Sequence, residues 1–247
     1  MTHLLFLGDP LAVADAVVGA STTLDGAEGR HAATVVRVRP GQCFYVSDGC
    51  GRRVLVEAAS VDRSVVRGTV LAVEDEPAPS PVFVLVQALA KGDRDEQAIE
   101  AATELGVDEV VPWQAERSVV VWRPDRVARA LSRWEAVVTR ATKQSRRSRM
   151  PFTSGPVDLP GLLERINRST LTVVLHEDAE RPLSNVALPE SGEVLVVVGP
   201  EGGISDRELD ALVAAGARPV RLGRTILRAS SAGPAALAVL SARARWQ

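Results

Sequence analysis

Residues 193–209, EVLVVVGPEGGISDREL, decide the fold of this chain. Val194–Val198 is an unbroken apolar run, mostly β-branched, which is typical of a strand buried on both faces of a sheet. The turn at 199–203 ends this strand, and Ser205 followed three residues later by Glu208 predicts a capping box. The helix that it starts is expected to end near Gly216. A strand, a glycine turn and a helix in succession predict an α/β unit.

A second glycine loop follows soon afterwards. Pro219–Leu222 predicts a short strand, Gly223 the turn after it, and residues 232–243 a final helix. Open α/β sheets bind ligands at the carboxyl ends of their strands, and glycine lets a flat ligand approach the backbone closely. Glycines that only close tight turns are the alternative. Five small or rigid residues in a row before a capped helix favour a binding loop.

Prolines mark the predicted boundary between two domains. Residues 1–73 alternate short apolar runs with turn signals, which predicts a small β-rich unit. Within it, Arg37 and Arg39 alternate with valines in HAATVVRVRPG, which predicts a strand with a basic face, a solvated face being the alternative. Residues 74–81, EDEPAPSP, predict a stiff linker. In residues 82–247 strands alternate with helices, which predicts a mostly parallel sheet covered on both faces.

The same reasoning gives the elements of this second domain. Buried apolar strands are predicted at Val82–Ala88, Val107–Val111 and Leu171–Leu175. Asp93 repeats the helix-capping pattern, and Pro124 suits the first position of a longer helix.

The helix predicted from Pro124 to about Arg147 has a basic side. At about 3.6 residues per turn, Trp134 and Val138 fall on its apolar side. The opposite side is a basic stripe without interleaved acids, made of Arg126, Arg129, Arg133, Arg140, Lys143 and Arg147. Like charges along a stripe repel one another unless an anion lies alongside, so the stripe predicts phosphate binding. A solvated helix face is the alternative.

Composition narrows the functional classes. The formal net charge of −2 means that an RNA partner would need a local basic patch. Two cysteines and three histidines do not make a zinc site, and no metal is expected. The first residues do not resemble a leader and no apolar run could span a membrane, so a cytoplasmic protein without a membrane partner is expected. The fingerprints of P-loop NTPases, Rossmann dinucleotide sites and G-x-S-x-G hydrolases are missing.

Several motifs together resemble the RsmE family, the ribosomal small-subunit RNA methyltransferases of the SPOUT superfamily that modify uracil N3. GPEGGISDREL followed by LGRTILRASSA resembles the C-terminal signature of that family. HAATVVRVRPG with the later DGCG resembles its PUA-like domain. The other matching stretches, in the family's order, are QALAKGD (Gln87–Asp93), TELGV (Thr103–Val107), ERS (Glu116–Ser118) and QSRRSRMP (Gln144–Pro151).

The resemblance implies a SPOUT-type trefoil-knotted α/β domain after a small PUA-like β-barrel domain. It also implies a homodimer that uses S-adenosylmethionine and acts on 16S rRNA of the small ribosomal subunit. Lys91, Arg117 and Arg147 match polar positions expected to meet RNA, with internal ion pairs as the alternative for the two arginines. The residues implied to contact the cofactor are Leu175, His176, Glu177, Gly199, Pro200, Glu201, Gly202, Gly203, Leu222, Gly223, Ile226, Leu227, Arg228 and Ala229.

The implied chemistry is direct methyl transfer to uracil N3, helped mainly by in-line positioning. Arg228 lies where a cation could stabilise charge on the uracil carbonyls, and Glu201 is the nearest carboxylate of the motif. A cap acceptor or a dimer contact is the alternative for Glu201. The chain departs from the family where Ala229-Ser230-Ser231 replaces Thr-Glu-Thr, and where Lys143 replaces Glu and Arg146 replaces Gly.

Two other functions stay open at this point. One is a SPOUT methyltransferase that acts on another RNA nucleotide. The other is an RNA-binding or ribosome assembly factor without catalytic activity, and cofactor binding separates it from both enzymes.

Overall fold

The computed structural model describes residues 3–246 and divides the chain into two compact units. The first contains the residues up to Ala78 together with Thr142–Met150, and the second contains Pro79–Ala141 together with the residues from Pro151 onward. Between the two units, strand β5 ends at Asp75 and strand β6 begins at Val82, so the proline-rich segment without secondary structure is 76–81.

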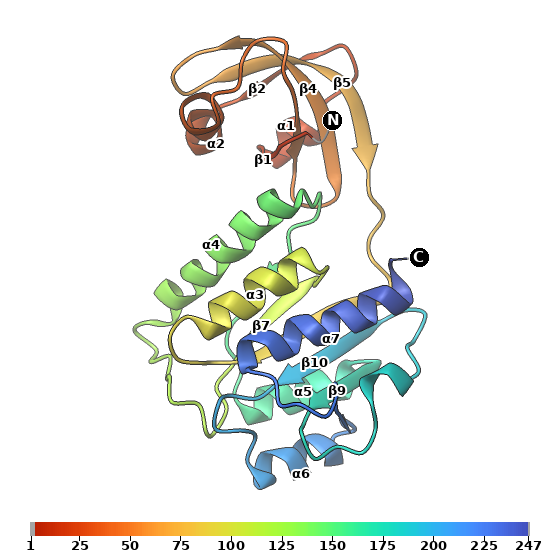
Figure 1. Cartoon of the computed structure of the whole chain (residues 1–247). Helices are drawn as coiled ribbons and strands as arrows, with labels where there is room; N and C mark the ends of the chain where they lie inside the picture. The colour runs from red at the N-terminus through yellow and green to blue at the C-terminus, as the bar shows by residue number, and fades with distance from the viewer. Residues whose placement is uncertain (1–2, 247) are drawn as a thin grey trace. The chain divides into compact units, whose positions relative to one another are not determined.

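The first unit is a curled five-stranded sheet in the order β1-β3-β4-β5-β2 (Figure 1). β1 pairs parallel with β3, and the other neighbours are antiparallel. Register shifts along the β4–β5 pair and the side-chain-free Gly68, which lies against the Glu57 carbonyl, help the sheet to curl. The elements are β1 (Leu5–Leu7), α1 (Pro10–Ala14), β2 (Ser21–Leu24), α2 (Gly26–Arg30), β3 (Cys43–Ser47), β4 (Arg52–Val61) and β5 (Val66–Asp75).

One predicted strand of this unit is wrong. Residues His31–Val36 form a π-helical turn, and Arg37 follows in the left-handed conformation with φ of 59°. Ala32 and Val38 are both buried, and the Val38 N–H donates to the Ala32 carbonyl at 3.0 Å. The alternation of valine and arginine therefore does not describe a strand, because tertiary burial of Ala32 and Val38 overrides the local period of two.

The second unit is a six-stranded sheet in the order β11-β9-β10-β6-β7-β8, and every neighbouring pair is parallel. Its strands are β6 (Val82–Ala88), β7 (Glu109–Trp113), β8 (Phe152–Thr153), β9 (Leu171–Leu175), β10 (Glu193–Val198) and β11 (Arg218–Val220). Its helices are α3 (Arg94–Glu104), α4 (Val127–Ser145), α5 (Leu159–Arg168), α6 (Asp206–Ala214) and α7 (Ala229–Ala244), with a 3-10 turn at Leu183–Asn185.

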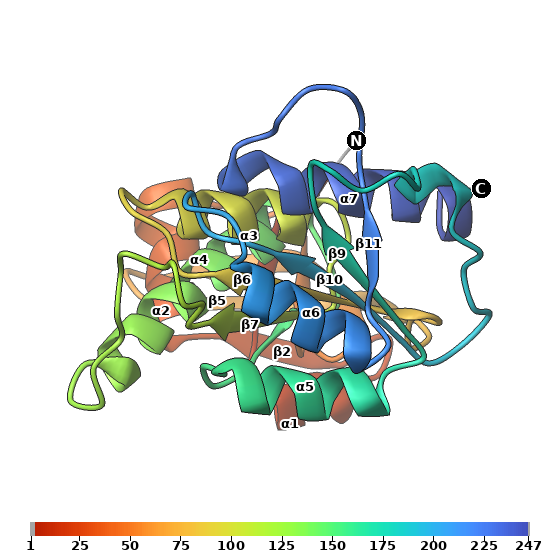
Figure 2. The same ribbon diagram turned by 90° about the horizontal axis from the view of Figure 1, so that it is seen from below.

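Helices cover both faces of this sheet, as predicted (Figure 2). On one face, side chains of α3, α4 and α7 pack with Phe83, Leu85, Val194 and Val196. On the other, α5 and α6 pack with the alternate strand residues such as Val84 and Leu195. Central strands that are apolar on both faces are what a doubly covered parallel sheet requires.

Several element ends differ from the prediction: β7 is Glu109–Trp113 rather than Val107–Val111, and α7 begins at Ala229 rather than at residue 232. α4 begins at Val127 rather than at Pro124, and its last turn belongs to the first unit. Asp93 precedes α3 in the left-handed conformation, and its side chain does not cap the helix. The capping box of Ser205 and Glu208 is confirmed at the start of α6.

The connection between β9 and β10 crosses the segment that follows β11. The Arg221 N–H donates to the Arg181 carbonyl at 3.0 Å, and the Leu183 N–H donates to the Arg221 carbonyl at 2.9 Å. Farther along the chain, the Arg243 guanidinium lies 3.4 Å from the Leu183 carbonyl. A trefoil-knotted connection requires such a crossing, and no local periodicity predicts it.

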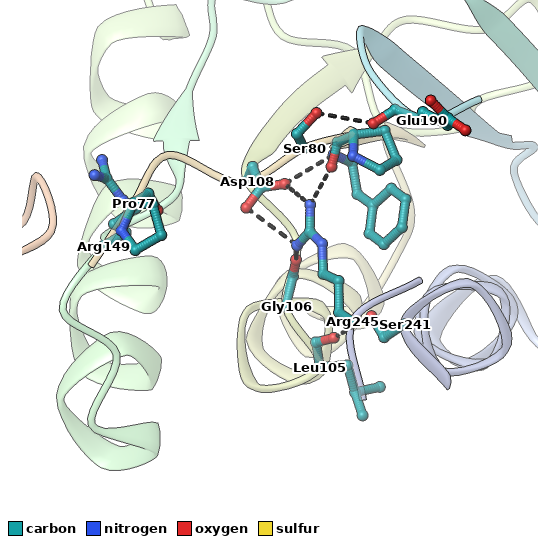
Figure 3. A network of polar contacts seen from close by, with 11 residues as sticks. Pro77, Ser80, Leu105, Gly106, Asp108, Arg149, Glu190, Ser241 and Arg245 are labelled. Carbon is teal, nitrogen blue, oxygen red and sulfur yellow. Dashed lines mark hydrogen bonds and ion pairs between the residues drawn. The ribbon is translucent and has the colours of Figure 1, made fainter. Parts of the chain in front are cut away.

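Arg245, directly after α7, binds to groups that lie just before strands β6 and β7 (Figure 3). Its guanidinium donates to the carbonyls of Gly106 and Pro81 at 2.5 and 2.6 Å, forms an ion pair with Asp108, and lies 4.0 Å from the Phe83 ring centroid. The side chains of Arg245 and Asp108 are only 18% and 11% exposed. Removing one member would leave the other charge largely buried and unpaired.

We expect Arg245→Ala to lower the free energy of unfolding by about 2–4 kcal/mol, because Asp108 and two carbonyls lose their donor. Urea unfolding measures the change. Arg168→Ala is the matched control, since that side chain is 80% exposed and its ion pair with Glu164 is 3.9 Å long. Equal losses for the two variants would contradict the prediction.

Candidate functional site

A cavity of the second unit lies at the carboxyl ends of β9 and β10. Its volume is about 380 Å³, which falls within the range of small-molecule sites. A smaller hollow of about 80 Å³ shares part of its lining and includes Leu222 and Gly223. The cavity is lined by Arg94, Leu175, His176, Glu177, Val198, Gly199, Pro200, Glu201, Gly203, Ile204, Ile226, Leu227, Arg228, Ala229 and Ala232.

The glycines of the 199–203 loop are required by close packing. A Cβ on Gly199 would lie 2.6 Å from Cγ1 of Ile204, and one on Gly202 would lie 3.2 Å from Cβ of Arg117. Gly203 has φ of 73°, and its N–H closes a turn to the Pro200 carbonyl at 2.9 Å. Side chains at these positions would push the loop out of its course, so the glycines shape the cavity wall.

Glu201 fixes this loop to the loop that follows β6. Its Oε1 accepts hydrogen bonds from the Lys91 N–H and from the Arg94 guanidinium, both at 3.1 Å. The carboxylate was expected to be catalytic, with a structural contact as the alternative. These bonds favour a positioning role, because they tie the carboxylate to the loop that follows β6.

A second set of bonds holds the other side of the loop. Nη1 of Arg117 lies 3.4 Å from the Gly202 carbonyl and 3.5 Å from the Ile204 carbonyl. The Glu116 N–H donates to Glu208 at 2.8 Å. The Ser205 hydroxyl donates to the Glu116 carboxylate at 2.7 Å and, together with the nearby arginines, lowers the pKa of that carboxyl. Arg117, expected to meet RNA or to form an ion pair, thus lies against the loop carbonyls.

The cavity brings together residues that are far apart in the sequence. Of the expected cofactor residues, thirteen line the cavity or its smaller neighbour, whereas Gly202 lines neither and packs on Arg117. Arg228 precedes α7 at its N-cap, and within residues 3–246 its guanidinium has no hydrogen-bond or ion-pair partner. The contact of the cofactor residues with a ligand stays a prediction.

Sequence reasoning missed several lining residues. Arg94 follows the QALAKGD motif directly, and Val198 and Ile204 flank the glycine loop, so proximity to the motifs was an available signal. Ala232 of α7 enters the site only through the crossing of the chain, which no local pattern reveals.

The basic stripe has a mixed environment. Trp134, Val138 and Ala141 are buried, which confirms the apolar side of α4. Lys91, Arg126, Arg129 and Arg140 are exposed, and Arg133 lies 3.8 Å from Glu96. Lys143 already pairs with Glu28 at 2.7 Å inside the first unit, and Arg147 is half-buried. Contact of the stripe and of Lys91 with RNA stays a prediction.

Neither a metal-ligand cluster nor a membrane-spanning helix occurs within residues 3–246. No group of three or more His, Cys, Asp or Glu side chains is placed to hold a metal ion. No helix in this range has the length and apolar character needed to cross a membrane.

Comparison with known proteins agrees with this geometry. The model of the RNA methyltransferase domain matches residues 76–241. The ribosomal RNA small subunit methyltransferase E of Mycobacterium bovis is 44% identical over 235 residues, with 92% of this chain and 89% of the relative covered. The one from Synechocystis is 30% identical over 230 residues, covering 92% and 74%.

Two solved structures share the fold over nearly their whole length. The Neisseria gonorrhoeae methyltransferase E bound to S-adenosylmethionine has a TM-score of 0.84 at 26% identity, and a putative methyltransferase of Legionella pneumophila with the same cofactor has 0.85 at 26%. Each comparison covers 98% of both chains. By sequence and by fold, the chain belongs to the ribosomal RNA small subunit methyltransferase E family.

Proposed function

We propose that this chain transfers a methyl group from S-adenosylmethionine to uracil N3 in 16S rRNA of the small ribosomal subunit. The observation that carries the proposal is the cavity at the carboxyl edge of β9 and β10. Three loops meet there, namely those after β9 (175–177), after β10 (199–204) and before α7 (226–229). The relatives named small subunit methyltransferase E, and the two similar structures that contain the cofactor, support it.

The lining of the cavity fits this cofactor. Leu175, Ile226 and Leu227 offer apolar walls for a flat adenine ring, while the glycine loop exposes backbone N–H and C=O groups. Ile226 lines the cavity and is 80% exposed, so a ligand bound there would cover its side chain. When bound, S-adenosylmethionine supplies an electrophilic methyl group.

The protein's own contribution is orientation and charge. The proton of uracil N3 would pass to solvent water, and the negative charge left on the base would spread onto the two flanking carbonyls. We assign the stabilisation of this charge to Arg228, which lines the cavity and whose guanidinium has no partner within residues 3–246. Glu201 would keep the loop in place rather than take the proton.

We extend the proposal to the rest of the chain. The first unit would be a PUA-like RNA-binding domain and the second unit the methyltransferase domain, joined by the linker 76–81. The expected bounds 1–73, 74–81 and 82–247 are shifted, because β5 runs to Asp75 and Thr142–Met150 belongs to the first unit. The active form would be a homodimer in the cytoplasm, where its ribosomal substrate is assembled. The family resemblance supports these points.

Methyl transfer is the direct test. Purified protein, labelled S-adenosylmethionine and small subunits that lack the modification should yield label in 3-methyluridine after digestion and mass analysis. Arg228→Ala should lower kcat by about tenfold or more while binding of the cofactor persists. Label in another nucleoside would indicate a different target. No label from a protein that binds the cofactor would indicate an assembly factor that kept the pocket.

Glu201 gives a prediction that separates positioning from catalysis. Glu201→Ala should weaken cofactor binding by about tenfold or more, because the loop loses two hydrogen bonds to a charged acceptor. Glu201→Gln should bind at an intermediate strength, since its Oε1 still accepts. Calorimetry measures the affinity, and kcat at saturating cofactor should change little.

The control is Glu104→Ala, which removes an exposed carboxylate at the end of α3. If Glu201 were the proton acceptor, both Glu201 variants would lose kcat at unchanged cofactor affinity. That result would reverse the assignment.

The basic stripe predicts salt-dependent RNA binding. Changing Arg129 and Arg140 together to Glu should weaken binding and reduce the salt slope by about two, roughly one for each phosphate that the variant no longer neutralises. Cofactor affinity should not change. Reversing the two exposed charges Arg168 and Arg218 is the control of equal charge. A salt slope that stays the same in the Arg129 and Arg140 variant would exclude the stripe from RNA binding.

A further inference from the structure

A separate hollow of about 160 Å³ lies beside the segment that follows β6. Its walls come from residues 90–96, from the loop after β7, and from the first turns of α4. It therefore lies at the same carboxyl edge of the sheet as the proposed cofactor cavity. Residues 90–96 contribute to both, since Arg94 lines the cofactor cavity and its neighbours line the hollow.

The apolar wall of the hollow includes the indole ring of Trp122, which packs against a second tryptophan. Trp122 is half-buried, and its ring meets the buried Trp134 edge to face, with centroids 5.5 Å apart at 80°. The Gln114 side chain holds the loop that carries Trp122. Its Oε1 accepts from the backbone N–H of Trp122 at 3.2 Å, and its Nε2 donates to the Val120 carbonyl at 3.0 Å. An indole held in this way loses little conformational freedom when a flat ring stacks on it.

The polar wall consists mostly of acceptors. Asp95 is only 7% exposed, burial raises the pKa of its carboxyl, and its Oδ1 accepts from the Glu96 N–H at 2.9 Å. Glu96 lies beside it, 3.8 Å from Arg133 of the basic stripe. Together with Asp93, these carboxylates would repel a phosphate, whereas they can accept hydrogen bonds from the amino group of a neutral base.

The surroundings suit an RNA strand. Arg129 lies one turn before Arg133 on α4, Arg126 lies directly before the helix, and both are exposed. Arg133 lines the hollow and the other two arginines continue the positive charge away from it. Cations beside an aromatic wall are the combination with which proteins hold single-stranded RNA, by its phosphates and its unstacked bases.

We infer that this hollow binds one amino-bearing nucleobase of the RNA substrate, a base near the methylated uridine that is turned out of its stack onto Trp122. The inference rests on the proposed function and names a specificity subsite for it. The target uracil itself belongs to the cofactor cavity, where Arg228 lies.

A double-substitution cycle between protein and RNA tests the inference. Wild-type protein, Trp122→Ala and Trp122→Phe would be titrated with oligonucleotides of the target region that carry one abasic nucleotide at each position in turn. With unmodified RNA, Trp122→Ala should bind roughly 5- to 100-fold more weakly and Trp122→Phe almost normally. At one flanking position, the abasic change should cost the wild type a similar factor and cost Trp122→Ala almost nothing.

Three controls keep the outcomes distinct. Trp246→Ala removes an exposed tryptophan elsewhere in the second unit and should bind RNA normally. Calorimetry should give Trp122→Ala an unchanged affinity for S-adenosylmethionine, which shows that the variant is folded. An arginine-rich peptide should not compete with RNA for the wild type, whereas competition that disappears in Trp122→Ala would assign the acidic hollow to a cationic partner and overturn the inference.

The absence of any abasic position coupled to Trp122 would also overturn it. Failure of the proposed function looks different. In that case the wild type would transfer no methyl group to uracil N3, while the coupling of Trp122 to one nucleotide would still be observed.

Discussion

Parallel pairing of every strand in the second sheet is the constraint on which the site depends. It brings the ends of β6, β7, β9 and β10 to one edge, so the loops after them become neighbours although their sequence positions span about a hundred residues. The glycine loop after β10 is held from both sides by the loops after β6 and β7. Glu201 makes the first contact and Arg117 the second. The cavity is therefore shaped by loops that brace one another.

Because the loops support one another, most charged residues of the motifs have a structural role rather than a catalytic one. Sequence reasoning assigns charged residues beside a glycine loop to substrate or catalysis. Here Glu201, Arg94 and Arg117 act mostly on backbone groups and on one another, and Glu116 joins the same network through Ser205. Arg228 differs, since it lines the cavity without a partner in the described part of the chain. Rigid support around a small number of reactive groups is how binding sites achieve accurate geometry.

Local sequence patterns predicted the second unit better than the first. Val82–Ala88 and Leu171–Leu175 were predicted to the residue, because a strand buried on both faces leaves a continuous apolar run. The strand expected around Arg37 and the side-chain cap of Asp93 were wrong, since both depend on backbone conformations set by tertiary packing. The resemblance to the family implied the loops of the cavity, but Ala232 and the Trp122 hollow depend on contacts between distant segments, which neither periodicity nor motif reports.

The strand order also has a consequence during synthesis. β6 can pair with β7 soon after both have been made, but its other edge pairs with β10, which emerges roughly a hundred residues later. At about 5–20 residues per second, this edge waits on the order of 5–20 seconds for its partner. The waiting strand is VFVLVQA, which has no charge to discourage association with another chain. During this period an apolar strand that is buried in the folded protein has an unpaired edge, at which the nascent chain can associate with other chains. A chaperone, or slow dilution on refolding, should therefore raise the yield of native protein.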